Sequence, residues 1–374
     1  MSQLAEDVYS DPDFYFGVEE KVDEIIENSL KPITVDVDLE GRYPKEVLKS
    51  LGQSGAFMQH LSSIREDGFC DMGEAIKLMS KVSHECLSTG FSVWCQDACA
   101  WYIEVGSNNY LKENMLPKIS SGEILAGTGM SNTMKAYADI EDLRLSGEKV
   151  DGGYIVNGSL PWVSNLGEDH MFGTLFAIDG DKDKPVMALV DCSSKGFELR
   201  LSAHFVALEG TRTFACIFND VFIPDEMIID HDGKSFMKKA RFGMIMLQAG
   251  MAAGNIQACI DICKDNEARL GHVNAYLDDR PEELQEELDD LLDACIALAE
   301  DPYDTSDDHF KDVLQLRLTA GELTLRASQS AMLHAGASGY LIKAKAQRKL
   351  RESYFVAIVT PAIKHLRKQL AEMA

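Results

Sequence analysis

Two pairs of cysteines are the first residues whose spacing could support chemistry. Cys95 and Cys99, and likewise Cys259 and Cys263, lie four residues apart, which places each pair on one face of a helix. Two thiolates could begin a metal site, but neither a Cys-x-x-Cys motif nor a pair of histidines supplies the remaining ligands. The nine cysteines are therefore predicted to be small core residues, and no metal site is expected.

The short motifs of the common catalytic mechanisms are also absent from the sequence. It has no Gly-x-Gly-x-x-Gly turn, no P-loop, no Gly-x-Ser-x-Gly and no His-Glu-x-x-His. The nine histidines are dispersed along the chain. A nucleotide cofactor, if the chain binds one, is therefore not expected to be held by a Rossmann turn.

The charge balance argues against two classes of partner. Of the 374 residues, 61 are acidic and 36 are basic, which gives a formal net charge of −25. Proteins that bind nucleic acid or an anionic membrane surface rely on Lys and Arg, so neither partner is expected. An anionic small molecule remains compatible with the composition if a few hydrogen-bond donors gather locally.

The N-terminus and the cysteine usage indicate a compartment. Residues 1–13 have neither a basic segment nor an apolar one, so no secretory signal is expected. No stretch approaches about 18 uninterrupted apolar residues, so no transmembrane helix is expected. An odd number of scattered cysteines is typical of reduced thiols, and we therefore expect a cytoplasmic protein.

The elements that must position any site follow from the apolar pattern, which changes twice along the chain. Residues 17 to about 120 indicate helices, including one capped by Asp71 and a buried one over residues 92–105. Short β-rich runs broken by Gly-Gly and Asn-Gly then predict five to seven strands up to about Asp230. Helical periodicity returns over residues 236–269, 281–298, 308–335 and 343–359.

The predicted fold class is α+β and mainly α. It comprises an N-terminal helical domain (residues 1–121), a middle β-barrel or sandwich domain (122–232) and a C-terminal four-helix bundle (233–374). A crevice between a helical bundle and a β-domain is a common place for a large cofactor.

Three segments resemble motifs of the acyl-CoA dehydrogenase superfamily of FAD flavoproteins, and the resemblance spans almost the whole chain. They are DGGYIVNGSLPWVSN (151–165), TFACIFNDVFIPDEMII (213–229) and HAGASGYL (334–341). In the family, the first segment carries a Trp beside the flavin ring and a hydroxyl residue that contacts it. The resemblance therefore implies that Trp162 and Ser164 hold a flavin, which suits a flat apolar partner and hydrogen bonds to its edge.

The resemblance implies further contacts with FAD. Thr128 and Ser131 match the family's flavin-side loop, and Arg269 represents the Arg that binds the pyrophosphate. Gly336 and Ala337 match a Gly-Gly pair at a helix end, and the Gly-Ala-Ser variant is closer to the family's flavin-dependent monooxygenases. A homodimer or homotetramer built through the C-terminal helices is also implied, with a neighbouring chain completing the FAD site.

The family's catalytic base has no obvious counterpart. In the family a Glu removes the substrate α-proton, and its two known positions correspond to Thr360 and Met244, neither of which is a general base. His365 should face another way on its helix, Glu352 should lie outside the pocket, and Glu209 is an acid of undetermined reach. The catalytic residue therefore stays unassigned.

Three functions follow from the resemblance. The first is an FAD-dependent oxidoreductase that acts on the CH–CH group of an acyl-CoA or a similar thioester, with an electron-transfer flavoprotein or a flavin reductase as partner. The second is a flavin-dependent monooxygenase or a desulfinase-like enzyme, which needs no α-proton removal. The third is a non-catalytic binding or scaffold homologue.

Overall fold

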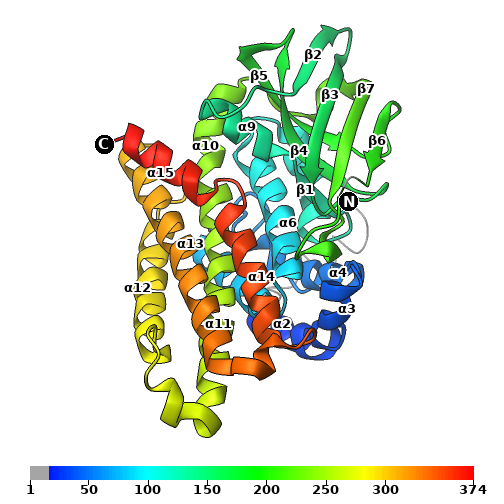
Figure 1. Ribbon diagram of the computed structural model, residues 1–374. Helices are drawn as coiled ribbons and strands as arrows, with labels where there is room; N and C mark the ends of the chain where they lie inside the picture. The colour runs from blue at the N-terminus through cyan, green and yellow to red at the C-terminus, as the bar shows by residue number, and fades with distance from the viewer. Residues whose placement is uncertain (1–16, 202) are drawn as a thin grey trace.

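The computed structural model describes residues 17–201 and 203–374 and stacks a β-sheet on a body of helices (Figure 1). The predicted lack of a secretory signal concerns residues 1–13 and lies outside the described residues. In the described part of the chain, no helix combines the length and apolar character needed to cross a membrane.

The N-terminal third is helical. Asp71 caps α5, since its side chain accepts a hydrogen bond from the Glu74 N–H at 2.8 Å, and α6 is buried along nearly its whole length. Both predictions are confirmed. The elements are α2 (Val18–Ile25), η2 (Ile26–Leu30), η3 (Lys31–Ile33), α3 (Thr34–Leu39), α4 (Lys45–Gln53), η4 (Ala56–Met58), α5 (Met72–Glu85), α6 (Leu87–Val105), α7 (Asn109–Asn114) and α8 (Leu116–Ser120).

The middle segment forms one eight-stranded sheet in the order β6-β7-β3-β2-β4-β5-β8, with β1 added beside β4. β1 and β2 pair with β4 in parallel, and the other pairs are antiparallel. The sheet encloses an apolar core of its own. The elements are β1 (Ala126–Thr128), α9 (Met130–Tyr137), β2 (Leu145–Val150), β3 (Gly153–Val163), β4 (Met171–Ile178), β5 (Asp181–Asp191), β6 (Phe197–Arg200), η5 (Glu209–Thr211), β7 (Phe214–Pro224), η6 (Asp225–Met227) and β8 (Ile228–Asp230).

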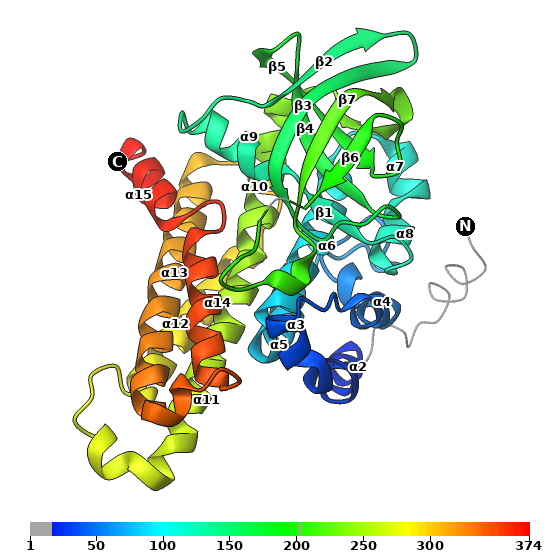
Figure 2. The same cartoon turned by 45° about the vertical axis from the view of Figure 1, so that its right-hand side comes forward.

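Long helices make up the C-terminal part, and α11 to α14 run side by side (Figure 2). The change from strands to helices falls between β8 and α10, next to the predicted boundary at residues 232 and 233; the division into three domains remains a prediction. The elements are α10 (Gly233–Met246), α11 (Gln248–Asn274), α12 (Pro281–Ala299), α13 (Asp307–Ala335), η7 (Gly336–Tyr340), α14 (Lys345–Ile358) and α15 (Ile363–Glu372).

Two local features differ from the expectation. The single helix predicted over residues 236–269 is divided at Leu247 into α10 and α11. The carbonyl of Met244 accepts a hydrogen bond from the Trp94 indole, and the Gly250 N–H bonds the carbonyl three residues back instead of four. In addition, helix α9 interrupts the strand region immediately after β1.

The nine cysteines are all unpaired and buried, as predicted for core thiols. Burial raises the pKa of each of these thiols. Within residues 17–201 and 203–374, no group of three or more His, Cys, Asp or Glu side chains is arranged to hold a metal ion.

Candidate active site

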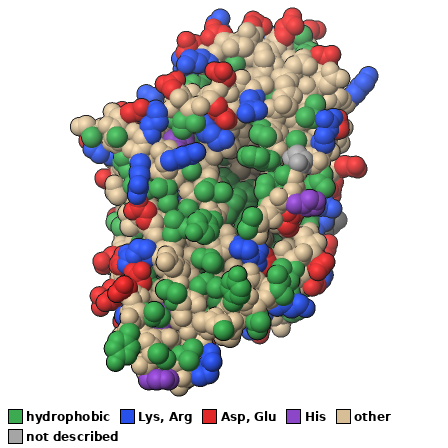
Figure 3. All heavy atoms as spheres, viewed as in Figure 1, with side chains coloured by type: hydrophobic (Ala, Val, Ile, Leu, Met, Phe, Trp, Pro, Cys, Tyr) green, Lys and Arg blue, Asp and Glu red, His purple; other side chains and the backbone are tan. Residues whose placement is uncertain are grey.

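A large cavity of about 890 Å³ lies where the sheet meets the helices. Figure 3 shows it as a hollow with hydrophobic walls on the face seen in Figure 1. Its walls come from α6, the β1–α9 junction, the end of β3, the 203–213 loop, α10 and α14. The described residues that line it are Phe91, Trp94, Thr128, Met130, Ser131, Met134, Lys135, Trp162, Ser164, Ala203, His204, Phe205, Val206, Ala207, Leu208, Thr211, Thr213, Met244, Leu350, Arg351, Tyr354, Phe355, Ile358, Val359 and Thr360.

Thr128 reaches the cavity from the end of β1, where the chain passes very close to the end of β3. Thr128 forms a β-bridge with Ser164, and its hydroxyl lies 2.7 Å from the Tyr102 hydroxyl. Gly127 permits this approach, because a Cβ atom there would lie 2.3 Å from the carbonyl oxygen of Ser164. The glycine therefore lets two of the predicted flavin contacts stand side by side.

Trp162 stands at the end of β3 with its indole on the cavity, and 58% of the residue is exposed. Its ring meets the edge of Phe205 at a centroid distance of 6.3 Å. A large exposed indole on an apolar cavity is typical of a surface that is covered by a ligand.

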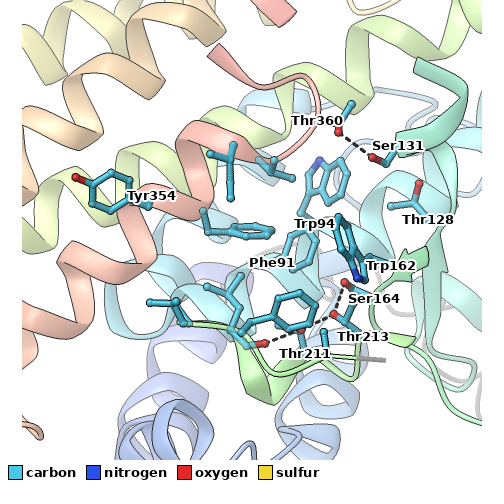
Figure 4. A pocket seen from close by; sticks show the side chains of 18 of the residues that line it. Phe91, Trp94, Thr128, Ser131, Trp162, Ser164, Thr211, Thr213, Tyr354 and Thr360 are labelled. Carbon is cyan, nitrogen blue, oxygen red and sulfur yellow. Dashed lines mark hydrogen bonds between the residues drawn. The ribbon is translucent and has the colours of Figure 1, made fainter. Parts of the chain in front are cut away.

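Ser164 begins a row of hydroxyls along one wall, which Figure 4 shows beside Trp162. Its Oγ lies 2.6 Å from Thr213 Oγ1, which lies 2.8 Å from Thr211 Oγ1. Thr211 in turn donates to the carbonyl of Leu208 at 2.7 Å. Because each hydroxyl has one proton, Thr213 must donate to Thr211 and Ser164 to Thr213, and each member keeps only the capacity to accept a hydrogen bond from a ligand.

Asn165, which follows Ser164, fixes the turn after β3. Its backbone has a φ of 63°, a conformation that Asn tolerates better than most residues. Its side chain accepts from the Tyr43 hydroxyl at 2.6 Å and donates to the carbonyl of Ala126 at 2.8 Å. The asparagine thereby ties the ends of β3 and β1 together beneath the cavity.

The opposite wall is aromatic, and sequence reasoning did not assign it to the site. Phe91 and Trp94 of α6 stack at a centroid distance of 5.5 Å, and Phe355 of α14 meets Phe91 edge-on at 4.5 Å. The signal available in the sequence was that α6 is apolar on nearly every side, but this pattern is also that of a core helix.

Met244 and Thr360, the two positions matched to the family base, both line the cavity. Met244 Sδ accepts a hydrogen bond from the Tyr102 hydroxyl at 3.0 Å, and burial raises the pKa of that phenol. Thr360 Oγ1 lies 2.8 Å from Ser131 Oγ (Figure 4). A thioether and a hydroxyl held in this way offer no general base at neutral pH.

The basic side chains at the cavity each lie near a carboxylate outside its lining. Arg351 forms an ion pair with Asp38, Lys135 lies 3.4 Å from Glu141, and His204 lies 3.7 Å from Glu209. Among the described residues that line the cavity there is no Asp or Glu. The charges of Arg351 and Lys135 are therefore balanced by carboxylates outside the lining.

Three other residues that could replace the family base, Glu209, Glu352 and His365, do not line the cavity. Glu209 accepts from the Phe205 backbone N–H and so supports the 203–213 loop. Glu352 is fully buried against Lys349 at 2.8 Å, and His365 is buried with a pKa lowered to about 4 by desolvation. Their positions agree with the expectation that Glu352 and His365 lie outside the pocket.

The remaining predicted cofactor residues lie far from the cavity. Arg269 is exposed in the last turns of α11. It follows Gln248, whose side chain contacts Thr360, by 21 residues, or about 30 Å of helix. Gly336 and Ala337 are exposed at the end of α13, beside the end of α11. Figure 2 shows both helix ends at the opposite end of the bundle from the sheet.

The predicted cofactor residues thus form two groups within one chain. Thr128, Ser131, Trp162 and Ser164 converge on the cavity, whereas Arg269, Gly336 and Ala337 share the far end of the bundle. Their roles remain predictions.

Comparison with known proteins identifies relatives over most of the chain. The family described as "Acyl-CoA dehydrogenase, N-terminal domain" matches residues 17–123. Isovaleryl-CoA dehydrogenase of Arabidopsis thaliana is 26% identical over 253 residues, which are 65% of this chain and 61% of that protein. Benzylmalonyl-CoA dehydrogenase of Aromatoleum aromaticum is 22% identical over 340 residues, 88% of this chain and 89% of that protein.

Solved structures share the fold. Butyryl-CoA dehydrogenase of Megasphaera elsdenii superposes with a TM-score of 0.84 at 16% identity, over 100% of this chain and 98% of that chain. This similarity establishes the arrangement of helices, middle sheet and long C-terminal helices that the sequence predicted. Other solved proteins of this fold contain bound flavin, FAD in one and FADH2 in another.

Proposed function

Because the chain belongs to the acyl-CoA dehydrogenase superfamily, we propose that it is an FAD-dependent oxidoreductase acting on the CH–CH group of an acyl-CoA or a similar thioester. The observation that carries this proposal is the cavity on which Trp162, Thr128, Ser131 and Ser164 converge from separate elements.

The cavity suits the ring system of a flavin. Its volume of about 890 Å³ lies in the range of sites that hold a large ligand. The Trp162 indole offers a flat apolar surface, and the hydroxyls of Ser164, Thr128 and Ser131 offer hydrogen bonds toward the same space. These residues would hold the isoalloxazine, which supplies a two-electron acceptor when it is bound.

The pyrophosphate of FAD would need donors from a second copy of the chain. Arg269 lies about 30 Å along its helix from the cavity wall of its own chain, so it cannot bind the phosphates of a flavin held there. A homodimer or homotetramer in which the far end of a neighbouring bundle approaches the cavity would bring Arg269 and Gly336 to those phosphates. We therefore include such an assembly in the proposal.

The protein's own groups around a substrate are apolar walls and hydroxyls. Phe91, Trp94 and Phe355 would exclude water from an acyl chain. Ser131 and Thr360 already hydrogen-bond each other, and either hydroxyl can orient a thioester carbonyl as a donor. Neither can take a proton from carbon at neutral pH, so the standard removal of an α-proton has no base among the described lining residues.

This last observation favours a second candidate function. A flavin-dependent oxygenation, in which a flavin reductase supplies the electrons and O2 is the oxidant, needs no removal of an α-proton, and neither does the loss of a sulfur group from a thioester. The side chains that line the cavity suit such a reaction, because it requires apolar walls and hydrogen bonds instead of a carboxylate. An electron-transfer flavoprotein would be the partner of the first function, and a flavin reductase of the second.

Two measurements test these proposals. The purified protein, or apoprotein reconstituted with FAD, should show the absorption bands of a bound flavin; a colourless protein that cannot be reconstituted would refute both enzymatic functions and favour a scaffold. The loaded protein is then mixed anaerobically with a panel of acyl-CoAs. Bleaching of the flavin by an acyl-CoA without a reductase supports the dehydrogenase. No bleaching by any acyl-CoA, together with an oxygenated product that forms only when a flavin reductase, its reductant and O2 are added, or with release of a sulfur group from a thioester, supports the second candidate.

A further inference from the structure

A buried cation lies behind the cavity wall without an acidic partner. Arg317 of α13 is 1% exposed, and no ion pair with a carboxylate joins it in the described part of the chain. Desolvation lowers its pKa to about 10, so the guanidinium stays charged at neutral pH. A buried charge is costly unless polar groups compensate it, so the groups it contacts show what it is held there to do.

The contacts of Arg317 all lead toward the C-terminal end of α14. Its Nη2 donates to the carbonyl of Val356, in the last turn of that helix. Carbonyls in a last turn lack helical partners, and the helix dipole places partial negative charge there. A cation at this point is therefore stabilised and fixes the end of α14.

The second contact passes through an amide. Arg317 Nε donates to Gln248 Oε1 at 2.7 Å, and Gln248 Nε2 donates to the carbonyl of Thr360 at 2.9 Å. Because a guanidinium only donates and a carbonyl only accepts, the amide of Gln248 can take one orientation between them. The position of the charge therefore dictates where the Thr360 carbonyl lies.

Thr360 is the residue through which this chain of contacts reaches the cavity. With its carbonyl held by Gln248, its hydroxyl faces Ser131 of α9 at 2.8 Å, across 229 residues of sequence (Figure 4). We propose that Arg317 is a positioning residue: through Gln248 and Val356 it holds the turn at residues 359–361, so that Thr360 meets Ser131 and closes this wall of the cavity. The statement that this wall belongs to an active site rests on the proposed function. The contacts of Arg317, Gln248 and Thr360 do not depend on that function.

A cross-link reports this position without any cofactor or substrate. In the reporter, Ser131→Cys and Thr360→Cys replace two hydroxyls that are 2.8 Å apart, a spacing near that needed for a disulfide. The nine native cysteines are buried, so they contribute little background. The rate of disulfide formation under a mild oxidant, measured by alkylation and mass spectrometry, then follows how often the turn faces α9.

The decisive variant is Gln248→Glu in the reporter background. The new carboxylate keeps the acceptor for Arg317, so the fold should be retained. It cannot donate to the Thr360 carbonyl, and losing that one hydrogen bond should slow cross-linking about five-fold. Arg317→Met should slow it at least as much, and Arg317→Lys should restore part of the rate. Arg326→Met, which removes an exposed Arg of the same helix, is the control and should leave the rate unchanged.

Each outcome decides the proposal. If Arg317→Met fails to fold, Arg317→Lys and Gln248→Glu still separate positioning from stability. Folded Gln248→Glu protein that cross-links at the reporter's own rate would overturn the inference. A protein that binds no flavin would refute the proposed function and leave this measurement intact, because the cross-link requires no flavin.

Discussion

Replacing Trp162 by Ala should weaken FAD binding much more than it weakens the fold. The residue is 58% exposed, and a Trp presents at most about 250 Å². If a flavin covers one face, roughly 70 Å² of that exposed area is removed from water, worth about 2 kcal/mol at about 25 cal/mol per Å². The dissociation constant for FAD should then rise about 30-fold.

The cost to stability should be smaller, because most of the indole is already in water. The main interaction that the substitution removes is the one with the edge of the Phe205 ring, at a centroid distance of 6.3 Å, worth about 1 kcal/mol. Trp162→Phe should be intermediate in FAD affinity, since a smaller ring covers less of the flavin.

The assay is a titration of apoprotein with FAD, followed by flavin fluorescence, with thermal unfolding of the same apoproteins. Phe69→Ala is the matched control, because Phe69 is also 58% exposed and does not line the cavity. It should leave the FAD dissociation constant unchanged. Equal FAD affinity for Trp162→Ala and wild type would refute the placement of the flavin on this indole, whatever the effect on stability.

Three further predictions concern the cavity and the core. Thr360→Glu should leave the flavin content unchanged and add anaerobic bleaching by acyl-CoAs, because it places a carboxylate on the cavity lining; loss of folding would instead mean that the side chain does not face the cavity. Glu352→Gln should cost about 3–5 kcal/mol in urea unfolding, because it removes the carboxylate that pairs with the fully buried Lys349, whereas Lys349→Met combined with Glu352→Leu should recover most of that loss. Equal losses in the single and double variants would argue against the ion pair. Burial lowers the pKa of His60 to about 4, so the unfolded state binds a proton first as the pH falls below about 6.5, and stability should fall by about 2 kcal/mol between pH 6.5 and 5. In His60→Gln this part of the acid sensitivity should be absent from melts at the two pH values.

The helical and sheet regions could be read from the sequence because local signals are strong there. The Asp71 cap of α5 and the all-round apolar character of α6 depend on residues within one or two turns. The division at Leu247 could not be read, because the helical pattern of residues 236–269 continues across it. The nearby hydrogen bond from the Trp94 indole to the carbonyl of Met244 joins residues 150 positions apart, and such a contact leaves no periodic signal in the sequence.

For the candidate site, the sequence indicated the wall that carries Trp162 and Ser164 but not the aromatic wall. Trp162 and Ser164 stand in a segment whose resemblance to a family is local, whereas Phe91, Trp94 and Phe355 are aromatic residues in helices that also form the core. Nothing near these three residues in the sequence separates a side chain that faces a cavity from one that faces a neighbouring helix. The separation of Arg269 from the cavity likewise depends on helix length in three dimensions.

The placement of acidic residues bears on which flavin reaction the cavity can support. Asp38 and Glu141 lie outside the lining and pair with Arg351 and Lys135, and Glu209 lies 3.7 Å from His204. These three carboxylates therefore contact side chains of the wall and are not part of the surface that a substrate would touch. Meanwhile, the walls that a substrate would touch combine aromatic rings with hydroxyls that already have partners.

The donors that these walls offer to a developing negative charge are the Ser131–Thr360 hydroxyl pair and the ion-paired side chains of Lys135 and Arg351. An enolate formed by removing an α-proton would still lack a base among the described lining residues. A flavin-dependent oxygenation, in which a reductase reduces the flavin and O2 is the oxidant, needs no such base. Acyl-CoA bleaching in Thr360→Glu, but not in the wild-type protein, would show that the carboxylate is the missing part of the dehydrogenation machinery. Bleaching in the wild-type protein would show that a proton acceptor lies outside the lining described above.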